Sequence, residues 1–351
     1  MLRLPRFRYL RPKSVAEAIR MMADAGPEGQ FVTGGTDLYP NMKRRQQTPK
    51  VVIGLAHLDA LRTTTGKPAE GMVLGAGLTL SEVAEDRRIQ DAYPVVSKAA
   101  ELISTPLLRN MGSIGGNLLL DTRCSYYNQN YEWRKGINFC MKKDGDTCWV
   151  APSSPRCWAA QSSDSAPVMA AIGAKVKLVS SAGERLLPAA ELYNDDGIHH
   201  LNKRSDELLT EIHLPPTNGW RATYWKLRRR GAFDFPVLGV ATCLRMTDDG
   251  TVEHARIVLG GVGSHPIEVT LSEQAIVGKK LTEETIHAAA EAAYSPAKPL
   301  DTSDFVPIWR KHMARYYVAC TLRELGGLPQ ALPETQNSVP LLRVFSSGPF
   351  S

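Results

Sequence analysis

The sequence contains no uninterrupted apolar run close to the ~20 residues that a membrane-spanning helix requires. The first nine residues carry arginines, but no apolar stretch follows them, which argues against a secretory signal, so we expect a cytoplasmic protein that does not enter a membrane. The chain also lacks a G-x-G-x-x-G motif, so a Rossmann nucleotide site is not supported. No internal repeat is present.

The composition is that of an ordinary globular protein. The 351 residues are 43% hydrophobic and 22% charged, which is enough for two or three domains with buried cores. The net charge of +6 is dispersed, and its densest run is only 228–230, so nucleic-acid binding is not indicated. A basic face for an acidic partner protein or an anionic cofactor explains the charge at least as well.

Cysteine is the first unusual feature. Four of the six cysteines follow the spacing C-x15-C-x7-C-x8-C. In a reducing cytosol, clustered thiols more often bind a metal than form disulfides, and four thiolates suit a structural zinc or an iron–sulfur cluster. The spacing matches neither zinc-ribbon knuckles nor the compact ferredoxin run, so buried free thiols are the alternative. The four are Cys124, Cys140, Cys148 and Cys157, whereas Cys243 and Cys320 are expected to be small core residues.

The segment that holds these four cysteines, residues 122–161, is rich in aromatic and basic residues. It contains seven aromatic residues, and six basic residues against three acidic ones. It shows no helical or strand period, so we expect a long irregular loop, and a loop of this length needs something to hold it. A metal centre tied by four thiolates and walled by aromatic rings would do so.

Two glycine pairs mark candidate phosphate sites. The first lies in Val32-Thr-Gly-Gly-Thr-Asp-Leu38, directly after a predicted strand, and the second lies in Gly112-Ser-Ile-Gly-Gly-Asn117. Without Cβ atoms, the backbone N–H groups of glycine can approach a pyrophosphate closely and form an anion-binding nest. Thr36, Ser113 and Asn117 offer additional side-chain donors. Two ordinary tight turns are the alternative interpretation.

The rest of the chain alternates predicted helices and strands. Capping boxes at 14–17 and 79–82 each open a helix, and the proline-rich segment 215–219 is the clearest linker. Beyond the linker, a hairpin turn at 248–250 joins antiparallel strands. Helices are expected at 14–25, 79–88, 94–103, 167–172, 282–293 and 303–325. Strands are expected at 31–32, 51–53, 72–74, 175–180, 224–228, 237–246 and 252–259.

The two glycine loops resemble the FAD loops of the flavin subunit of molybdenum hydroxylases, the xanthine dehydrogenase and carbon monoxide dehydrogenase family. Their order and spacing agree, and so does the flanking Arg109-Asn110. The resemblance implies an α+β fold with a two-part FAD-binding domain of the PCMH type at 1–217. It also implies a C-terminal α+β domain at 218–327, like that of the carbon monoxide dehydrogenase flavoprotein, followed by an extended tail at 328–351.

The resemblance further implies roles for individual residues. Asp164 is expected to bind the ribityl or ribose hydroxyls of FAD, with helix capping as the alternative. Leu209, or its neighbour Leu208, is expected to pack on the isoalloxazine, and Lys226 to lie near the flavin ring, with a solvated strand residue as the alternative. The residues expected around FAD are Val32, Thr33, Gly34, Gly35, Thr36, Asp37, Leu38, Gly112, Ser113, Ile114, Gly116, Asn117, Asp164, Leu209 and Lys226.

The cysteine segment is an insertion in this family pattern. The family's aspartate and proline, expected soon after the second glycine loop, are displaced here to 163–167. A four-cysteine insertion at this place resembles one branch, the beta subunits of 4-hydroxybenzoyl-CoA reductases, which carry a [4Fe–4S] cluster besides FAD. The resemblance implies that Cys124, Cys140, Cys148 and Cys157 are the cluster ligands.

The same resemblance implies an electron-transfer subunit that does not bind the aromatic substrate. Electrons from ferredoxin would pass through FAD to a [2Fe–2S] small subunit and then to a molybdopterin-binding large subunit, for reductive dehydroxylation. The chain has no molybdopterin or [2Fe–2S] signature of its own, so partners would supply both. Two alternatives stay open: a flavin subunit of another molybdenum hydroxylase with a different substrate, and a flavoprotein whose cysteine loop binds structural zinc.

Overall fold

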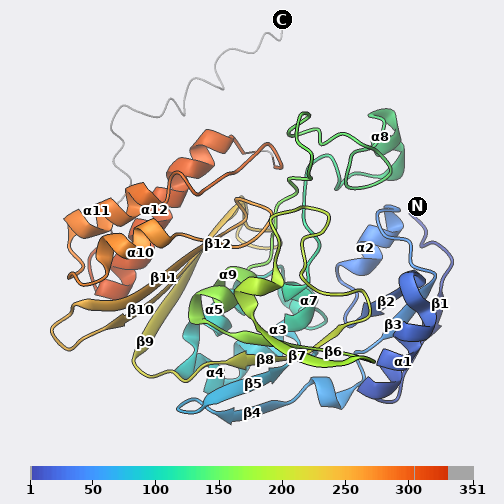
Figure 1. Cartoon of the computed structure of the whole chain (residues 1–351), viewed down its shortest axis with the longest axis horizontal. Coiled ribbons are helices and arrows are strands. Elements are labelled where there is room, and N and C mark those ends of the chain that lie inside the picture. The colour runs from blue at the N-terminus through green and yellow to red at the C-terminus, as the bar shows by residue number, and fades with distance from the viewer. Residues whose placement is uncertain (1, 304, 331–351) are drawn as a thin grey trace, which may run out of the picture.

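A computed structural model describes residues 2–303 and 305–330, which form three β-sheets with helices packed between and around them (Figure 1). The predicted tail at 328–351 lies outside the described residues beyond residue 330. The mixture of helices and sheets is the α+β architecture that the sequence predicts.

The N-terminal sheet is small and parallel, with the order β1-β3-β2. Ser14 caps the first helix, as predicted, by accepting a hydrogen bond from the backbone N–H of Glu17 at 3.1 Å, and Gly26 ends that helix with φ at 55°. One face of the helix, with Ala18 and Met22, is buried against this sheet. The elements are β1 (Arg8–Leu10), α1 (Val15–Ala25), β2 (Gly29–Val32), α2 (Leu38–Lys43) and β3 (Val51–Gly54).

The second sheet has five strands in the order β4-β5-β8-β6-β7, all antiparallel to their neighbours. Its strands are β4 (Thr64–Lys67), β5 (Gly71–Gly75), β6 (Lys175–Ser180), β7 (Gly183–Pro188) and β8 (Leu208–Leu214). The helices around it are α3 (Leu80–Glu85), α4 (Arg87–Ala92), α5 (Pro94–Leu102), α6 (Pro106–Arg109), α7 (Ile114–Leu118) and α9 (Ser165–Ile172).

The helix predicted at 79–88 is in fact two helices. The capping box at Thr79 and Glu82 is present and begins α3. Asp86 is extended, with ψ at 112°, and its side chain accepts from the backbone N–H of Arg88 at 2.9 Å, which begins α4. An aspartate that can cap a new helix therefore divides the predicted one.

The third sheet has the order β12-β11-β10-β9, and its strands are antiparallel. Helices α5 and α9 pack on it from the side of the second sheet, and α10 to α12 cover it from the other side (Figure 1). The elements are β9 (Trp220–Leu227), β10 (Leu238–Met246), β11 (Val252–Gly260), β12 (Ile267–Glu268), α10 (Thr270–Ile276), α11 (Glu283–Ala292) and α12 (Pro307–Gly326).

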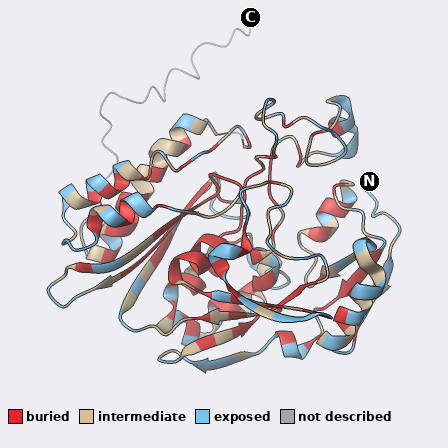
Figure 2. Cartoon of the chain, viewed as in Figure 1, coloured by how far each residue is buried: buried red, intermediate tan, exposed pale blue. Residues whose placement is uncertain are grey.

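The cysteine insertion, residues 122–161, stands out from the body of the molecule (Figure 1). It is mostly irregular, as expected, but it contains one unpredicted helix, α8 (Tyr131–Gly136). Asn130 caps this helix by accepting from the backbone N–H of Trp133 at 2.9 Å. Helix α8 is mostly exposed (Figure 2). The four cysteines of the insertion are buried.

Candidate functional site

A cavity of about 440 Å³ lies between the N-terminal sheet and the second sheet, and both glycine loops line it. Ordinary ligand pockets have volumes in this range. The cavity is lined by all the residues expected around FAD except Ile114, Asp164 and Lys226. Leu208 and Leu209, the alternatives for the isoalloxazine contact, both lie on its wall.

The first glycine loop joins β2 to α2 and is packed tightly on the second loop. Gly35 has φ at 69°, in the left-handed region that glycine adopts without strain. A Cβ atom on Gly34 would stand 1.7 Å from the carbonyl oxygen of Met111, just before the second loop. Gly34 is therefore required for the two loops to meet, independently of any ligand.

The second loop begins α7. Ser113 caps the helix by accepting from the backbone N–H of Gly116 at 3.1 Å. Asn117 is turned toward α9, where its Oδ1 accepts from the Ser163 hydroxyl at 2.7 Å and the Ser165 N–H at 3.2 Å. A Cβ atom on Gly116 would meet only the Ser113 hydroxyl, at 3.0 Å, and this glycine lines the cavity. That open, backbone-lined wall fits the approach of a cofactor diphosphate.

Asp164 and Lys226 lie together at the junction between the second and third sheets. Lys226 Nζ is 2.9 Å from Asp164 Oδ2 and donates to the Leu102 carbonyl at 2.9 Å. The Tyr224 hydroxyl donates to Asp164 Oδ1 at 2.8 Å. Neither Asp164 nor Lys226 lines the cavity. Asp164 is the residue before α9, but its side chain makes no capping hydrogen bond.

Several residues that line the cavity were not predicted from the sequence. Lys203 borders it, and burial lowers the pKa of its ammonium to about 8. Phe235, Gln47 and Asp121 also line it. Asp121 directly precedes the insertion, and that position is the one signal in the sequence that could have identified it. Phe235 lies far along the chain, and no local pattern marks it.

The insertion is fastened to the first glycine loop and to α2. The guanidinium of Arg123 forms an ion pair with Asp37, the last residue before α2, and stacks over the ring of Phe235 at 4.8 Å. The Arg134 side chain, fully buried, donates to the carbonyls of Arg44 and Arg45 at 3.0 and 3.2 Å. The cysteine segment and the first glycine loop are therefore one connected structure.

The four cysteines of the insertion are gathered in a buried region. Cys124, Cys140 and Cys157 belong to one apolar cluster, and burial raises the pKa of Cys124 to about 11. A hydrogen bond from Cys157 lowers the pKa of Cys148 to about 6, and the same contact raises the pKa of Cys157. All four are free and buried thiols.

Gathered thiols are the donor set of an iron–sulfur centre, so the residue chemistry fits such a group. Within residues 2–303 and 305–330, however, no three histidine, cysteine, aspartate or glutamate side chains are arranged to hold a metal ion. The cluster assignment of Cys124, Cys140, Cys148 and Cys157 therefore stays a prediction.

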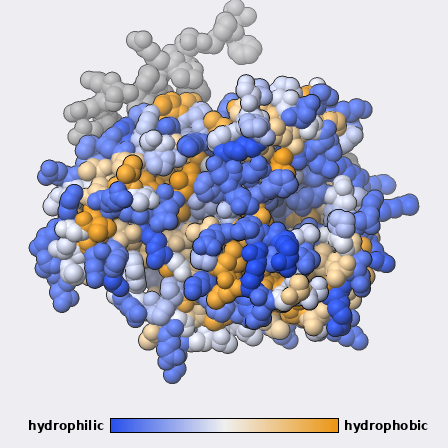
Figure 3. Space-filling view, in the orientation of Figure 1, coloured by the Kyte–Doolittle hydropathy of each residue, from blue (hydrophilic) through white to orange (hydrophobic). Residues whose placement is uncertain are grey.

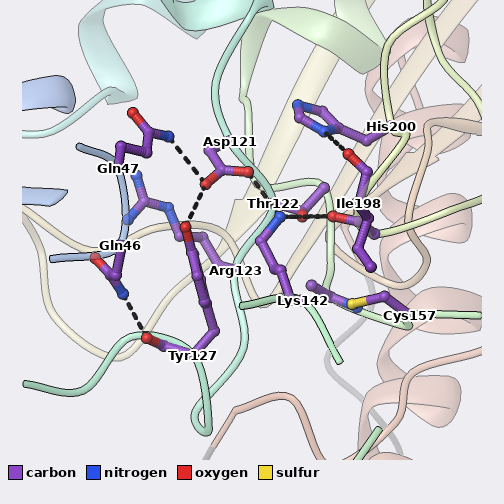
Figure 4. A network of polar contacts seen from close by, with 12 residues as sticks. Gln46, Gln47, Asp121, Thr122, Arg123, Tyr127, Lys142, Cys157, Ile198 and His200 are labelled. Atoms are coloured by element: carbon purple, nitrogen blue, oxygen red, sulfur yellow. Dashed lines mark hydrogen bonds and ion pairs between the residues drawn. The ribbon is translucent and has the colours of Figure 1, made fainter. Parts of the chain in front are cut away.

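A polar network joins the insertion to the cavity wall (Figure 4). Asp121 accepts from Lys142 Nζ at 2.8 Å, from the Tyr127 hydroxyl at 3.1 Å and from Gln47 at 3.2 Å. Burial is the largest single influence on Asp121 and raises its pKa, but the nearby Lys142, His200 and Tyr127 together outweigh it and leave the pKa below the usual value. Asp121 is therefore a stabilised carboxylate at the edge of the cavity.

Comparisons with known proteins place these observations in a family. Residues 5–217 match the family described as the FAD binding domain in molybdopterin dehydrogenase, and residues 222–325 match the CO dehydrogenase flavoprotein C-terminal domain. The chain belongs to this family of FAD-binding subunits of molybdenum hydroxylases, so it is an oxidoreductase subunit with FAD as its cofactor. The predicted α+β fold, with an FAD-binding domain and a C-terminal domain of the CO dehydrogenase type, is confirmed.

Individual relatives agree with this assignment. The chain is 30% identical over 297 residues to the aldehyde oxidoreductase FAD-binding subunit PaoB of Escherichia coli K12, covering 81% of this chain and 90% of the relative. It is 28% identical over 302 residues to the carbon monoxide dehydrogenase medium chain of Hydrogenophaga pseudoflava, covering 85% and 89%. A solved carbon monoxide dehydrogenase structure from that organism matches with a TM-score of 0.74 at 26% identity, covering 92% of this chain and 97% of that one.

None of the helices within the described residues is both long enough and apolar enough to cross a bilayer. On the face seen in Figure 3, hydrophobic side chains gather only in small patches among hydrophilic ones.

Proposed function

We propose that this chain is the FAD and [4Fe–4S] electron-transfer subunit of a molybdenum-containing 4-hydroxybenzoyl-CoA reductase. Its partners are a molybdopterin-binding large subunit and a [2Fe–2S] small subunit, ferredoxin is the electron donor, and the complex is cytoplasmic. The proposal includes the division into an FAD-binding domain at 1–217 and a C-terminal domain at 218–327.

The observation that carries the proposal is the buried set of four cysteines beside the flavin cavity. Burial removes the thiols from solvent and oxidants, and Tyr126 and Tyr127 pack in the same apolar cluster as three of them. Arg123, the residue before Cys124, pairs with Asp37 of the first glycine loop. A redox group on these sulfurs would therefore be held by the same segment that forms the cavity wall.

FAD takes up one or two electrons, so when bound it can couple one-electron clusters to a two-electron reaction. The chain's own residues bind and orient that cofactor. The glycine loops offer backbone N–H groups to the diphosphate, and Leu208 and Leu209 offer an apolar wall to the ring system. Lys203, on the cavity wall, adds a positive charge that favours an anionic ligand.

In this proposal, Asp164 and Lys226 shape the cavity from behind. Lys226 donates to the carbonyl of Leu102, and Leu102 immediately precedes two cavity-lining residues, Ile103 and Ser104. The buried pair fixes this stretch of backbone. We therefore assign Asp164 and Lys226 a positioning role toward FAD.

The second candidate is a flavin subunit for a different substrate. The relatives named above are subunits of an aldehyde oxidoreductase and a carbon monoxide dehydrogenase. This likeness favours the family's general electron-transfer role with a substrate other than 4-hydroxybenzoyl-CoA. Assay of the assembled complex with 4-hydroxybenzoyl-CoA and reduced ferredoxin separates the two candidates. No dehydroxylation there, together with oxidation of an aldehyde or another substrate when an electron acceptor is supplied, would support the second.

The first experiment is analysis of iron, acid-labile sulfide, zinc and flavin in anaerobically purified protein. We expect about four iron and four sulfide per FAD. Cys140→Ser should lose the iron, whereas Cys243→Ser, which removes an equally buried thiol outside the insertion, should keep it. One zinc without iron would contradict the electron-transfer proposal and favour a structural metal.

The FAD site is tested separately with Gly116→Ala. The new methyl group would crowd the Ser113 hydroxyl at 3.0 Å on the cavity wall, where the diphosphate is proposed to approach the backbone, so we expect loss of FAD. Gly136→Ala, at the end of α8 with nothing near its Cβ position, is the matched control and should keep FAD. Full flavin occupancy in Gly116→Ala would contradict the diphosphate assignment.

A further inference from the structure

Three of the six basic side chains of the insertion are buried. The side chains of Arg134, Lys142 and Arg123 are 0%, 6% and 9% exposed, whereas the acidic residues Glu132, Asp144 and Asp146 are on the surface. A buried cation is costly unless it is compensated by a nearby negative charge or by hydrogen bonds. Each of these buried cations accordingly has a carboxylate partner, and Asp144, although exposed, pairs with Arg134 at 3.7 Å.

Lys142 is the cation whose position is fixed most completely. It lies between the second and third cysteines of the insertion, and its ammonium donates to three oxygens. These are Asp121 Oδ1 at 2.8 Å, Thr122 Oγ1 at 2.8 Å and the Gly197 carbonyl at 2.6 Å. Since an ammonium has three protons, every donor is used and the charge is held in one place.

The oxygens that bind the Lys142 ammonium belong to two different sites. On one side, Asp121 lines the flavin cavity. On the other side, Gly197 packs directly on Cys157: its N–H donates to the Cys157 carbonyl at 2.9 Å, and a Cβ atom on it would stand 2.6 Å from the Cys157 sulfur. Figure 4 shows Lys142 between Asp121 and Cys157.

We propose that Lys142 is a positioning residue that holds one fixed positive charge between the flavin cavity and the cysteine set, and that this charge raises the reduction potential of the iron–sulfur group. The inference rests on the proposed function. A reduced cluster is more negative by one charge than the oxidised one, so a nearby cation stabilises the reduced form. Asp121 offsets part of this effect, because its carboxylate neutralises the same ammonium.

The test uses the full chain, purified anaerobically, with the cluster potential measured by spectroelectrochemical titration. In Lys142→Met, we expect the ratio of reduced to oxidised cluster at a fixed potential to fall about tenfold, which is about 59 mV for one electron. Lys142→Arg keeps the charge and should restore most of the potential. Lys143→Met is the matched control, because that lysine pairs with Asp144 on the surface and should leave the potential unchanged.

Asp121→Asn distinguishes an electrostatic role from a structural one. The amide oxygen can still accept from Lys142, but the neutralising charge is gone, so the potential should rise in this variant and fall in Lys142→Met. Opposite shifts are not expected from a loop that has merely loosened. If Lys142→Met loses its iron, only the potential of Asp121→Asn can be measured. A rise in that potential then supports the inference, and an unchanged potential overturns it.

The outcomes also separate this inference from the function on which it rests. Wild-type protein without iron would overturn the proposed function, and the inference with it. Protein that retains its iron, but whose potential is the same in Lys142→Met, Asp121→Asn and wild type, would overturn the inference alone.

Discussion

One buried lysine–aspartate pair lies behind the flavin cavity, and a second lies at its edge. Lys226 and Asp164 are 2.9 Å apart, and Lys142 and Asp121 are 2.8 Å apart. In each pair, a tyrosine hydroxyl also donates to the aspartate. Each pair joins segments that are distant in the sequence: the first joins the FAD-binding part to the third sheet, and the second joins the insertion to the cavity wall.

The two pairs differ in how deeply they are buried. The side chains of Lys226 and Asp164 are 1% and 4% exposed, against 6% and 12% for Lys142 and Asp121. Burial raises the pKa of Asp164 despite its partners, whereas the partners of Asp121 prevail over burial and lower its pKa. Similar ion pairs therefore have different effects: one clamps two layers, and the other keeps a charge at a site.

Removing one partner of the more deeply buried pair, Lys226 and Asp164, should have the largest effect on stability. Asp164→Ala leaves Lys226 as an uncompensated buried cation, so we expect the free energy of unfolding to fall by roughly 3–5 kcal/mol. Urea unfolding of the apoprotein measures it. The double variant Asp164→Leu with Lys226→Met, which removes both charges, should recover most of the loss. A cost below about 1 kcal/mol for Asp164→Ala would contradict the description of this pair as a clamp.

Breaking the second pair should cost less. Asp121→Ala removes one charged partner at the edge of a cavity that water can reach, so we expect a loss of roughly 1–3 kcal/mol in the free energy of unfolding. The matched control is Asp146→Ala, which removes an exposed aspartate of the same insertion and should change stability by about 0.5 kcal/mol or less. Equal costs for Asp121→Ala and Asp164→Ala would remove the distinction between the pairs.

Most of the fold is predictable from the sequence because it rests on local signals. The cap at Ser14 and the glycine at 26 place α1, and alternating apolar residues place β10 and β11 within a residue or two. The local signals are insufficient where one residue is compatible with two arrangements. Asp86 is such a residue, because its side chain begins a new helix inside a predicted one. The signals also fail at α8, where the cap by Asn130 is the only signal.

The site is predictable only in part, for a different reason. The glycine loops are contiguous motifs, so their place on the cavity wall could be predicted. The pairing of Asp164 with Lys226, and of Arg123 with Asp37, joins residues many positions apart. No periodicity encodes such contacts, because they follow from how the sheets pack. The same is true of Lys203 and Phe235, which reach the cavity only in the folded chain.

Lowering the pH should change the stability contributions of the two aspartates in opposite directions. Because the pKa of Asp164 is raised, the native state binds its proton more tightly, and its contribution to stability falls as pH rises from the usual 3.8 through the raised value. The pKa of Asp121 is lowered, so its contribution is present above 3.8 and is lost as pH falls below it.

The unfolding free energy of wild type, Asp164→Asn and Asp121→Asn, measured against pH, tests these trends. On acidification, wild type should gain stability relative to Asp164→Asn and lose it relative to Asp121→Asn. Parallel trends for both variants would show that the two carboxyl groups have similar surroundings.

The smallest effect should come from an exposed pair at the same junction as Lys226 and Asp164. Lys98 of α5 and Glu324 of α12 are 3.3 Å apart, and their side chains are 41% and 38% exposed. We expect Lys98→Met to lower the free energy of unfolding by about 1 kcal/mol or less, because water and salt screen the pair. The difference from wild type should shrink further in 1 M salt. If Lys98→Met instead costs as much as Asp164→Ala, then position at the junction, and not burial, determines the strength of these contacts.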